Sequence, residues 1–189
     1  MRASNPTLVA ASRTITSQRD AMVARWSDWL RDRITVAHGI DPALVEHQLA
    51  LILDALASMV GPLRRETKPI WARVTEHYGR LAAARGLAAG EVVEEMQYLR
   101  ELLIRYLAPS IAALRPRQGM ALLLRLNRVV DQGVAIAVVG YTDAIVRTLL
   151  PGHGGELTPD TESFDGDAAE RELADIARSL TTINSRANG

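Results

Sequence analysis

Residues 76–107 constrain the fold more than any other stretch of this chain, because they combine two amphipathic helical patterns. In the second pattern the apolar residues are spaced by four, three, four and three positions, at Val92, Met96, Leu99, Leu103 and Tyr106. Such spacing keeps one apolar face on the same side of a helix. A short loop with Arg85, Gly86 and Gly90 joins the two patterns. The architecture that follows is helix packed on helix.

The same periodicity recurs along the chain and predicts an all-α fold. We expect a globin-like or up-and-down bundle of five to six main helices, completed by an acidic linker and a C-terminal helix. The helices are predicted at 17–34, 42–60, 68–85, 90–107, 117–150 and 168–183. Residues 110–114 should form a short helical or irregular piece between Pro109 and Pro116.

Local signals mark where two of these helices begin. Asp41 followed by Pro42 is an N-cap residue with proline at the first helical position. Thr16 or Ser17 can cap the helix predicted at 17–34. Residues 1–16 are expected to be flexible or partly helical, with a short turn near Pro6.

Small residues within the helix predicted at 117–150 indicate a close helix contact. They are Gly133, Ala135, Ala137 and Gly140. Each glycine in a helix interior costs about 1 kcal/mol relative to alanine. Either packing compensates for this or the helix kinks, and we favour close packing.

The most apolar run, residues 129–150, is predicted to be a buried helix without membrane insertion. It contains Asp131, Gln132, Asp143 and Arg147, and charged side chains are costly in the middle of a membrane-spanning helix. The first 20 residues lack the unbroken apolar stretch of a secretory signal. We therefore expect a cytoplasmic protein. The absence of cysteine excludes disulfides and thiolate chemistry.

Charge is distributed unevenly and suggests four segments. Residues 155–175 contain eight acidic residues against Arg171 alone. The segments are 1–16, a helical sensor domain at 17–150, an acidic linker at 151–167 and a signalling or dimerisation helix at 168–189. The basic residues of the body form no dense block, so nucleic acid is not an expected partner.

The C-terminal helix is expected to stand apart from the body. Its apolar positions Leu173, Ile176, Leu180 and Ile183 form a narrow face. A narrow face of this kind is typical of a helix that pairs with a partner helix.

Histidine is the residue type here best able to carry a cofactor. His77 borders the apolar face of the helix predicted at 68–85, so an inward His77 could ligate haem in a globin-like domain. The simpler interpretation is a boundary histidine that is satisfied by a hydrogen bond. No metal site and no catalytic residue are predicted, because the His and Glu spacings do not match a metal motif and titratable groups do not converge on an apolar face.

Aromatic residues are the candidates for a ligand pocket or an interface. They are Trp26, Trp29, Trp71, Tyr78 and Tyr141. Trp26 is expected in the core, while Trp29 and Trp71 lie off the main apolar stripes. At least one of those two is therefore predicted to face a neighbouring helix, a dimer partner or a cavity.

Several loose motifs resemble the N-terminal sensor domain of the RsbT co-antagonist proteins (RsbRD type). They are A-R-W-x-x-W-L at 24–30, R-x-x-x-A-R-G with Arg80 and Arg85, E-x-x-x-L-R with Glu95 and Arg100, and Gly140-Tyr141 in a long final helix. The resemblance covers residues 17–150 and implies a compact helical domain without haem that dimerises. In that family the domain precedes a STAS, kinase or other output domain.

The resemblance therefore implies a non-enzymatic sensory or regulatory domain of the stress-response type. A signal, either a small apolar ligand or a partner protein, would change helix packing and reach a downstream output domain or partner. Because the printed chain ends at Gly189, it is interpreted either as the sensor part of a longer protein or as a stand-alone regulator. A haem- or tetrapyrrole-binding sensor that uses His77 is the alternative function.

Overall fold

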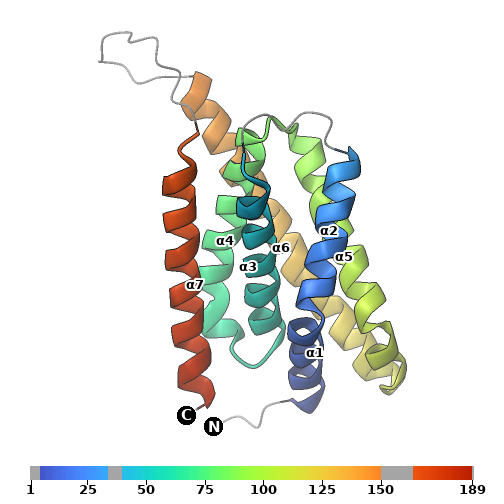
Figure 1. Ribbon diagram of the computed structural model, residues 1–189. Coiled ribbons are helices and arrows are strands. Elements are labelled where there is room, and N and C mark those ends of the chain that lie inside the picture. The colour runs from blue at the N-terminus through green and yellow to red at the C-terminus, as the bar shows by residue number, and fades with distance from the viewer. Residues whose placement is uncertain (1–4, 34–39, 150–163, 189) are drawn as a thin grey trace.

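A computed structural model describes residues 5–33, 40–149 and 164–188, and the regular elements within them are all α-helices. The helices are α1 (Pro6–Ser17), α2 (Arg19–Arg33), α3 (Pro42–Val60), α4 (Arg64–Ala84), α5 (Ala89–Ala112), α6 (Pro116–Leu149) and α7 (Gly166–Asn188). They form one bundle, in which α6 crosses the other helices obliquely (Figure 1). The prediction of an all-α fold is confirmed.

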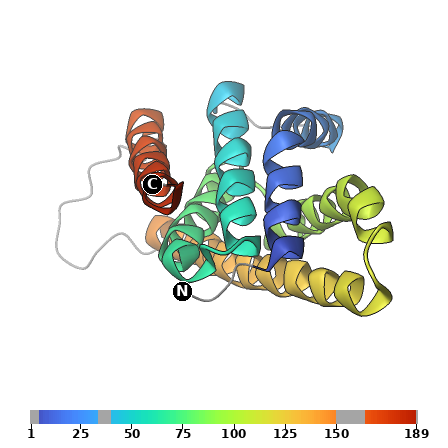
Figure 2. The ribbon, with the colours of Figure 1, turned by 90° about the horizontal axis from the view of Figure 1, so that it is seen from below.

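Helix α3 is the central element of the bundle. It contacts α1, α2, α4, α6 and α7, and Figure 2 shows it between α7 and α1. Asp41 caps it, because Asp41 Oδ1 accepts a hydrogen bond from the Ala43 N–H at 2.8 Å, as the Asp-Pro signal predicted. Its apolar residues at spacings of three and four positions are fully buried: Leu49, Ile52, Leu56 and Met59.

Helices α4 and α6 cross at very short range. A Cβ atom added to Gly79 of α4 would lie 1.9 Å from the Ala137 carbonyl oxygen. One added to Gly140 of α6 would lie 2.3 Å from the Glu76 carbonyl oxygen, and one at Gly133 would meet the Trp71 ring at 2.6 Å. The close packing that we favoured is confirmed, and α6 continues as one helix through Gly133 and Gly140.

Two helices are longer than predicted. In each, the predicted limit lay near a proline, and the structure places that proline inside the helix. Helix α4 begins at Arg64 rather than 68, and α5 continues to Ala112 rather than ending at 107. A proline removes the hydrogen bond to the carbonyl four residues earlier. Pro69 and Pro109 are both exposed, as are Arg65 and Arg105, whose carbonyls lose the bond. Water can hydrate these carbonyls, so each helix tolerates its proline.

The N-terminal segment forms a helix of its own, which the prediction for residues 1–16 understated. Asn5 Oδ1 accepts from the Thr7 N–H at 3.0 Å, and Pro6 follows Asn5 at the first helical position. Ala11 and Ile15 are buried in the common core. The predicted cap at Thr16 or Ser17 is wrong. Both hydroxyls donate to carbonyls within α1, and α2 starts at Arg19.

Helix α7 packs on the body, so the expectation that it stands apart is wrong. Leu173 and Ile176 are fully buried and Leu180 is 3% exposed, because their narrow face lies on α3 and α4. The helix starts at Gly166, where Asp165 Oδ1 accepts from the Ala168 N–H at 2.9 Å. The acidic linker therefore ends at Asp165, and its residues before 164 lie outside the described part of the chain.

Two helices, α3 and α6, are long and apolar enough to cross a membrane by length and composition. In α3 two thirds of the apolar window is buried, as in the core helix of a globular protein. In α6 the buried share is 28%, so the prediction of a buried helix holds for one face only. The other face exposes large apolar side chains: Met120, Leu124, Val139, Val146 and Leu149.

We predict that G140A destabilises the protein by about 2–4 kcal/mol, because the added methyl group forces the α4 and α6 backbones apart. The matched control is G90A, since a Cβ at Gly90 meets nothing within 4 Å. That variant should be neutral or gain up to about 1 kcal/mol. Urea unfolding measures both, and equal effects of the two substitutions would refute the close crossing.

Candidate functional site

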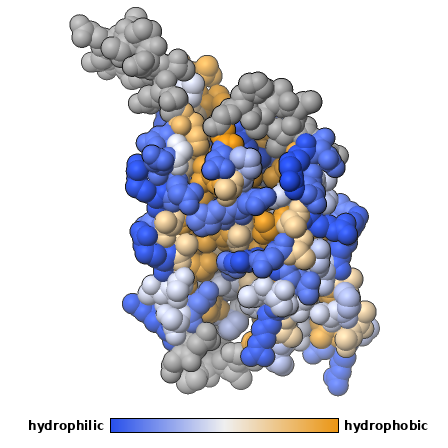
Figure 3. All heavy atoms as spheres, viewed as in Figure 1, coloured by the Kyte–Doolittle hydropathy of each residue, from blue (hydrophilic) through white to orange (hydrophobic). Residues whose placement is uncertain are grey.

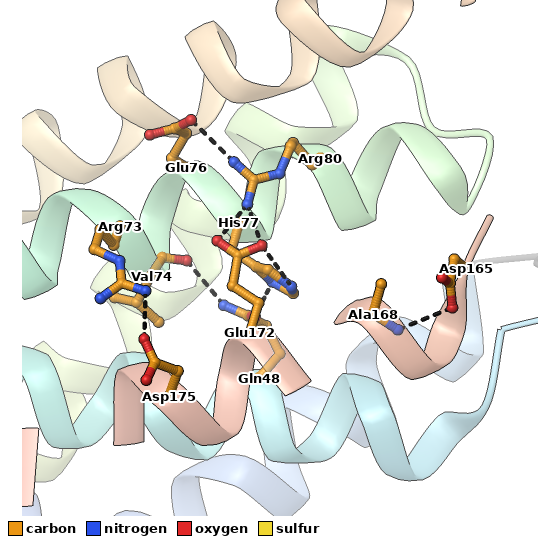
Figure 4. Close-up of polar contacts among 10 residues, drawn as sticks. All are labelled: Gln48, Arg73, Val74, Glu76, His77, Arg80, Asp165, Ala168, Glu172 and Asp175. Carbon is orange, nitrogen blue, oxygen red and sulfur yellow. Dashed lines mark hydrogen bonds and ion pairs between the residues drawn. The ribbon is translucent and has the colours of Figure 1, made fainter. Parts of the chain in front are cut away.

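Helix α4 presents one row of polar side chains to α7. Arg73, His77 and Arg80 follow one another by four and three positions, so they share one face of the helix. Figure 4 shows this face opposite Glu172 and Asp175 of α7. The candidate functional site is the surface formed by these α4 side chains and the adjoining side of α3, and we call it the α7 dock.

Ion pairs join the two helices across the α7 dock. Both carboxylate oxygens of Glu172 accept from Arg80 Nη2 at 2.7 Å, and Arg80 Nη1 also donates to Glu76 at 2.9 Å. Arg73 donates to Asp175 at 3.0 Å. These side chains are between a quarter and about half exposed, and pairs in such settings contribute little stability. Their main effect is to fix the register of α7 on α4.

His77 lies beneath these ion pairs and is 3% exposed. Gln48 Nε2 donates to the Val74 carbonyl at 2.9 Å, which leaves Gln48 Oε1 to accept from His77 Nδ1–H at 2.6 Å. Burial lowers the pKa of His77, although the Glu172 carboxylate opposes this shift. The lowered pKa favours the neutral form of His77, whose Nε2 lies 4.0 Å from Glu172.

This arrangement bears on the haem alternative. With Nδ1 bonded to Gln48, Nε2 is the ring nitrogen left to ligate an iron, and α7 covers it through Glu172. Haem ligation by His77 would therefore require α7 to move away. The arrangement matches the simpler interpretation, a histidine satisfied by a hydrogen bond.

Apolar contacts contribute most of the free energy that holds α7 on α3 and α4. Leu173, Ile176 and Leu180 are buried, and each such side chain contributes about 1.5–3 kcal/mol when it is removed from water. On the α3 side, His47 Nδ1 lies 3.1 Å from Glu170, and Ser58 donates to Asn184 at 3.1 Å. The α7 dock is thus an apolar stripe bordered by polar contacts on both sides.

A second polar cluster lies on another side of α4 and is fully enclosed. Arg85 forms a double hydrogen bond with Glu95 of α5, at 3.1 and 2.7 Å, and Tyr78 donates to the same carboxylate. All three side chains are at most 3% exposed. The Arg85 guanidinium also lies over the Tyr78 ring, 5.7 Å from its centroid. We call Tyr78, Arg85 and Glu95 the buried triad.

The end of α4 positions Arg85 for this contact. Gly86 has a φ of 78°, a conformation that favours glycine. The Leu87 N–H bonds to the Ala82 carbonyl and the Gly86 N–H to the Ala83 carbonyl, which is the hydrogen-bond pattern of a Schellman cap. The R-G pair thus turns the chain toward α5 and places the guanidinium beside Glu95.

The electrostatics of the triad keep the guanidinium charged in the core. Burial lowers the pKa of Arg85, but the Glu95 carboxylate more than offsets this, so the pKa is raised overall. Burial and Glu95 raise the pKa of Tyr78 well above its usual value, so the phenol keeps its proton. All three side chains are buried, so the triad connects α4 to α5 within the core.

The sequence-predicted aromatic residues lie within or between helices. Trp26 and Trp71 are fully buried, and the Trp26 ring lies 5.9 Å from that of Tyr78. Trp29 stacks on Tyr98 at 4.5 Å between α2 and α5. The Tyr141 hydroxyl donates to the Leu87 carbonyl at 2.7 Å, which links α6 to the turn after α4.

Sequence reasoning missed both polar clusters. Glu95 was considered only as part of the E-x-x-x-L-R motif, but it is buried with Arg85. One signal was available, since Glu95 falls three residues after Val92 and four before Leu99 on the predicted apolar face. Within residues 5–33, 40–149 and 164–188, no group of three or more His, Asp or Glu could hold a metal ion.

Comparisons with protein-family models, with curated proteins and with solved structures find no match to this chain. The function therefore has to be inferred from the contacts described above.

We predict that E95A destabilises the protein by about 3–5 kcal/mol, because it leaves the Arg85 charge buried and unpaired. The double variant R85M/E95L removes both charges and should lose less than E95A alone. The control is E101A, which breaks an exposed pair with Arg105 and should change stability by no more than about 0.5 kcal/mol. Thermal and urea unfolding give the values. Similar small losses for E95A and E101A would contradict the role of the triad.

Proposed function

We propose that this protein is a non-enzymatic regulatory domain in which α7 docks on α3 and α4 and transmits a signal when it shifts or leaves. The observation that carries this proposal is the mode of attachment of α7. Within the described residues, α7 contacts α3 and α4 alone, by one apolar stripe with polar borders. The resemblance to RsbRD-type sensor domains agrees with a domain that regulates a downstream output domain or partner.

The contacts that join α1 to α6 support this proposal, because several of them are made without α7. The α4–α6 crossing, the buried triad and the aromatic contacts all lie outside the α7 dock. An element attached by one face to a complete core opens at a lower free energy than the core itself. Release of α7 would also expose Arg73, Arg80 and His77, which are polar groups that water can hydrate.

A groove beside α7 is the place where a small apolar ligand would act. It has a volume of about 490 Å³ and lies between α1, α3 and α7, with Val9, Leu51 and Leu180 in its walls. Figure 3 shows apolar surface in the middle of this face, between the hydrophilic outer sides of α7 and α2. A ligand that fills the groove would touch α7 and α3 together and could favour one docking state over another.

The exposed face of α6 supports a homodimer. Of the seven large apolar side chains that are exposed among the described residues, five lie on α6. Exposed apolar side chains gathered on one element are typical of a protein interface. We propose that a second copy of the chain covers the part of this face that carries Val139, Val146 and Leu149.

The release of α7 can be tested by introducing a charged side chain on its buried face. I176D should detach α7, so that protease cleaves within residues 166–188 first and leaves the remaining helices resistant. T182D places the same charge on the same helix, at an exposed position, and should behave as wild type. If I176D unfolds the whole domain in one step, or if α7 stays protected, α7 is not a separable element.

The dimer is tested by the mass in solution. Light scattering should give a dimer for the wild type and a monomer for V139K/V146K, because the lysines place charge in the proposed interface. T182K on α7 should stay dimeric. A monomeric wild type, or a double variant of unchanged mass, would refute this interface.

A further inference from the structure

A cavity at one end of the bundle gathers arginines that lie far apart in the sequence. It has a volume of about 510 Å³, and four arginines line it: Arg64 of α4 and Arg117, Arg125 and Arg128 of α6. None of the described residues in its lining is acidic. The volume is in the range of sites for small-molecule ligands. A concave surface with four cations and no carboxylate attracts anions.

Three of the four cavity arginines have no carboxylate partner in the described part of the chain. Arg19, Arg73, Arg80, Arg85, Arg100 and Arg105 each pair with a carboxylate. Arg64, Arg117 and Arg128 form no ion pair or hydrogen bond with another side chain in the described part of the chain. Their charges are therefore free to act on a ligand.

Arg125 is held in place at the cavity by backbone groups. Its Nη2 donates to the Gly61 carbonyl at 3.0 Å and to the Met59 carbonyl at 3.3 Å, at the end of α3. Its Nε is buried without a hydrogen-bond partner among the described residues. Burial and the Arg64 charge lower the pKa of Arg125, which is the direction expected where like charges meet without a counterion.

Three helices begin at this cavity and add to its positive potential. Asn5 and Thr7 come from the start of α1, Arg64 from the start of α4, and Arg117 and Gln118 from the start of α6. No side chain caps the first turn of α4. Helix N-termini carry partial positive charge and free N–H groups that bind anions. Figure 2 shows α1 beginning beside α6 at this end of the bundle.

We propose that this cavity binds a small phosphorylated molecule of nucleotide size. A guanidinium group can donate two parallel hydrogen bonds to the oxygens of one phosphate. Four arginines supply more positive charge than a ligand with a single carboxylate would neutralise. The volume leaves room for an organic group beside the phosphates, against the apolar side chains of Leu8 and Leu122. This site is separate from the α7 dock, and no residue lines both.

The test is calorimetric titration of the full chain with pyrophosphate and with ATP at matched ionic strength. Both should bind the wild type, and ATP should bind more tightly because its nucleoside adds apolar contact. R117Q/R128Q should weaken binding at least tenfold, since each charged hydrogen bond is worth about a factor of ten. These two arginines are exposed, so their loss should leave the fold intact.

The matched control is R115Q, which removes an exposed arginine two residues before Arg117 that does not line the cavity. It should bind both probes as the wild type does. Absence of binding, or equal binding by R117Q/R128Q and wild type, would overturn the proposal. Binding to vesicles of phosphatidylglycerol without binding of ATP or pyrophosphate would also overturn it, in favour of a membrane surface.

Discussion

The close crossing of α4 and α6 is the contact on which the rest of the structure depends. Gly79, Gly133 and Gly140 bring the two helices together so tightly that a methyl group at any of them would collide with a neighbour. Such a contact fixes the rotation of α4 about its own axis, because only one side of α4 can approach α6. The other sides of α4 are then directed toward α5 and α7.

That orientation explains why two polar clusters can coexist on one helix. Arg85 and Tyr78 face Glu95 in an environment without water, whereas Arg73 and Arg80 meet α7 near the surface. A buried ion pair is costly to break, so α5 stays on α4. Exposed pairs contribute little, so three apolar side chains contribute most of the attachment of α7, which is the helix that we propose to move.

Much of the fold could be predicted from spacing alone, because apolar stripes and helix starts are local signals. Asp41-Pro42 was recognised, while Asn5-Pro6 carries the same signal at a helix that was predicted only as a short turn. Pro69 and Pro109 led to wrong predictions of the limits of α4 and α5. The cost of a proline inside a helix depends on whether the carbonyl four residues earlier is exposed to water, and that exposure depends on the tertiary structure. The partner of α7, the pairing of Arg85 with Glu95, and the gathering of four arginines depend on tertiary packing. A single sequence does not reveal such contacts.

Native-state hydrogen exchange tests most directly whether α7 is a separable helix on a fixed core. In the full chain, the amides of α7 should exchange at a markedly lower free energy than those at the α4–α6 crossing, and with a smaller dependence on denaturant. Exchange of both sets at one common free energy would show that α7 opens only when the whole protein unfolds. That result would contradict the regulatory role proposed for α7.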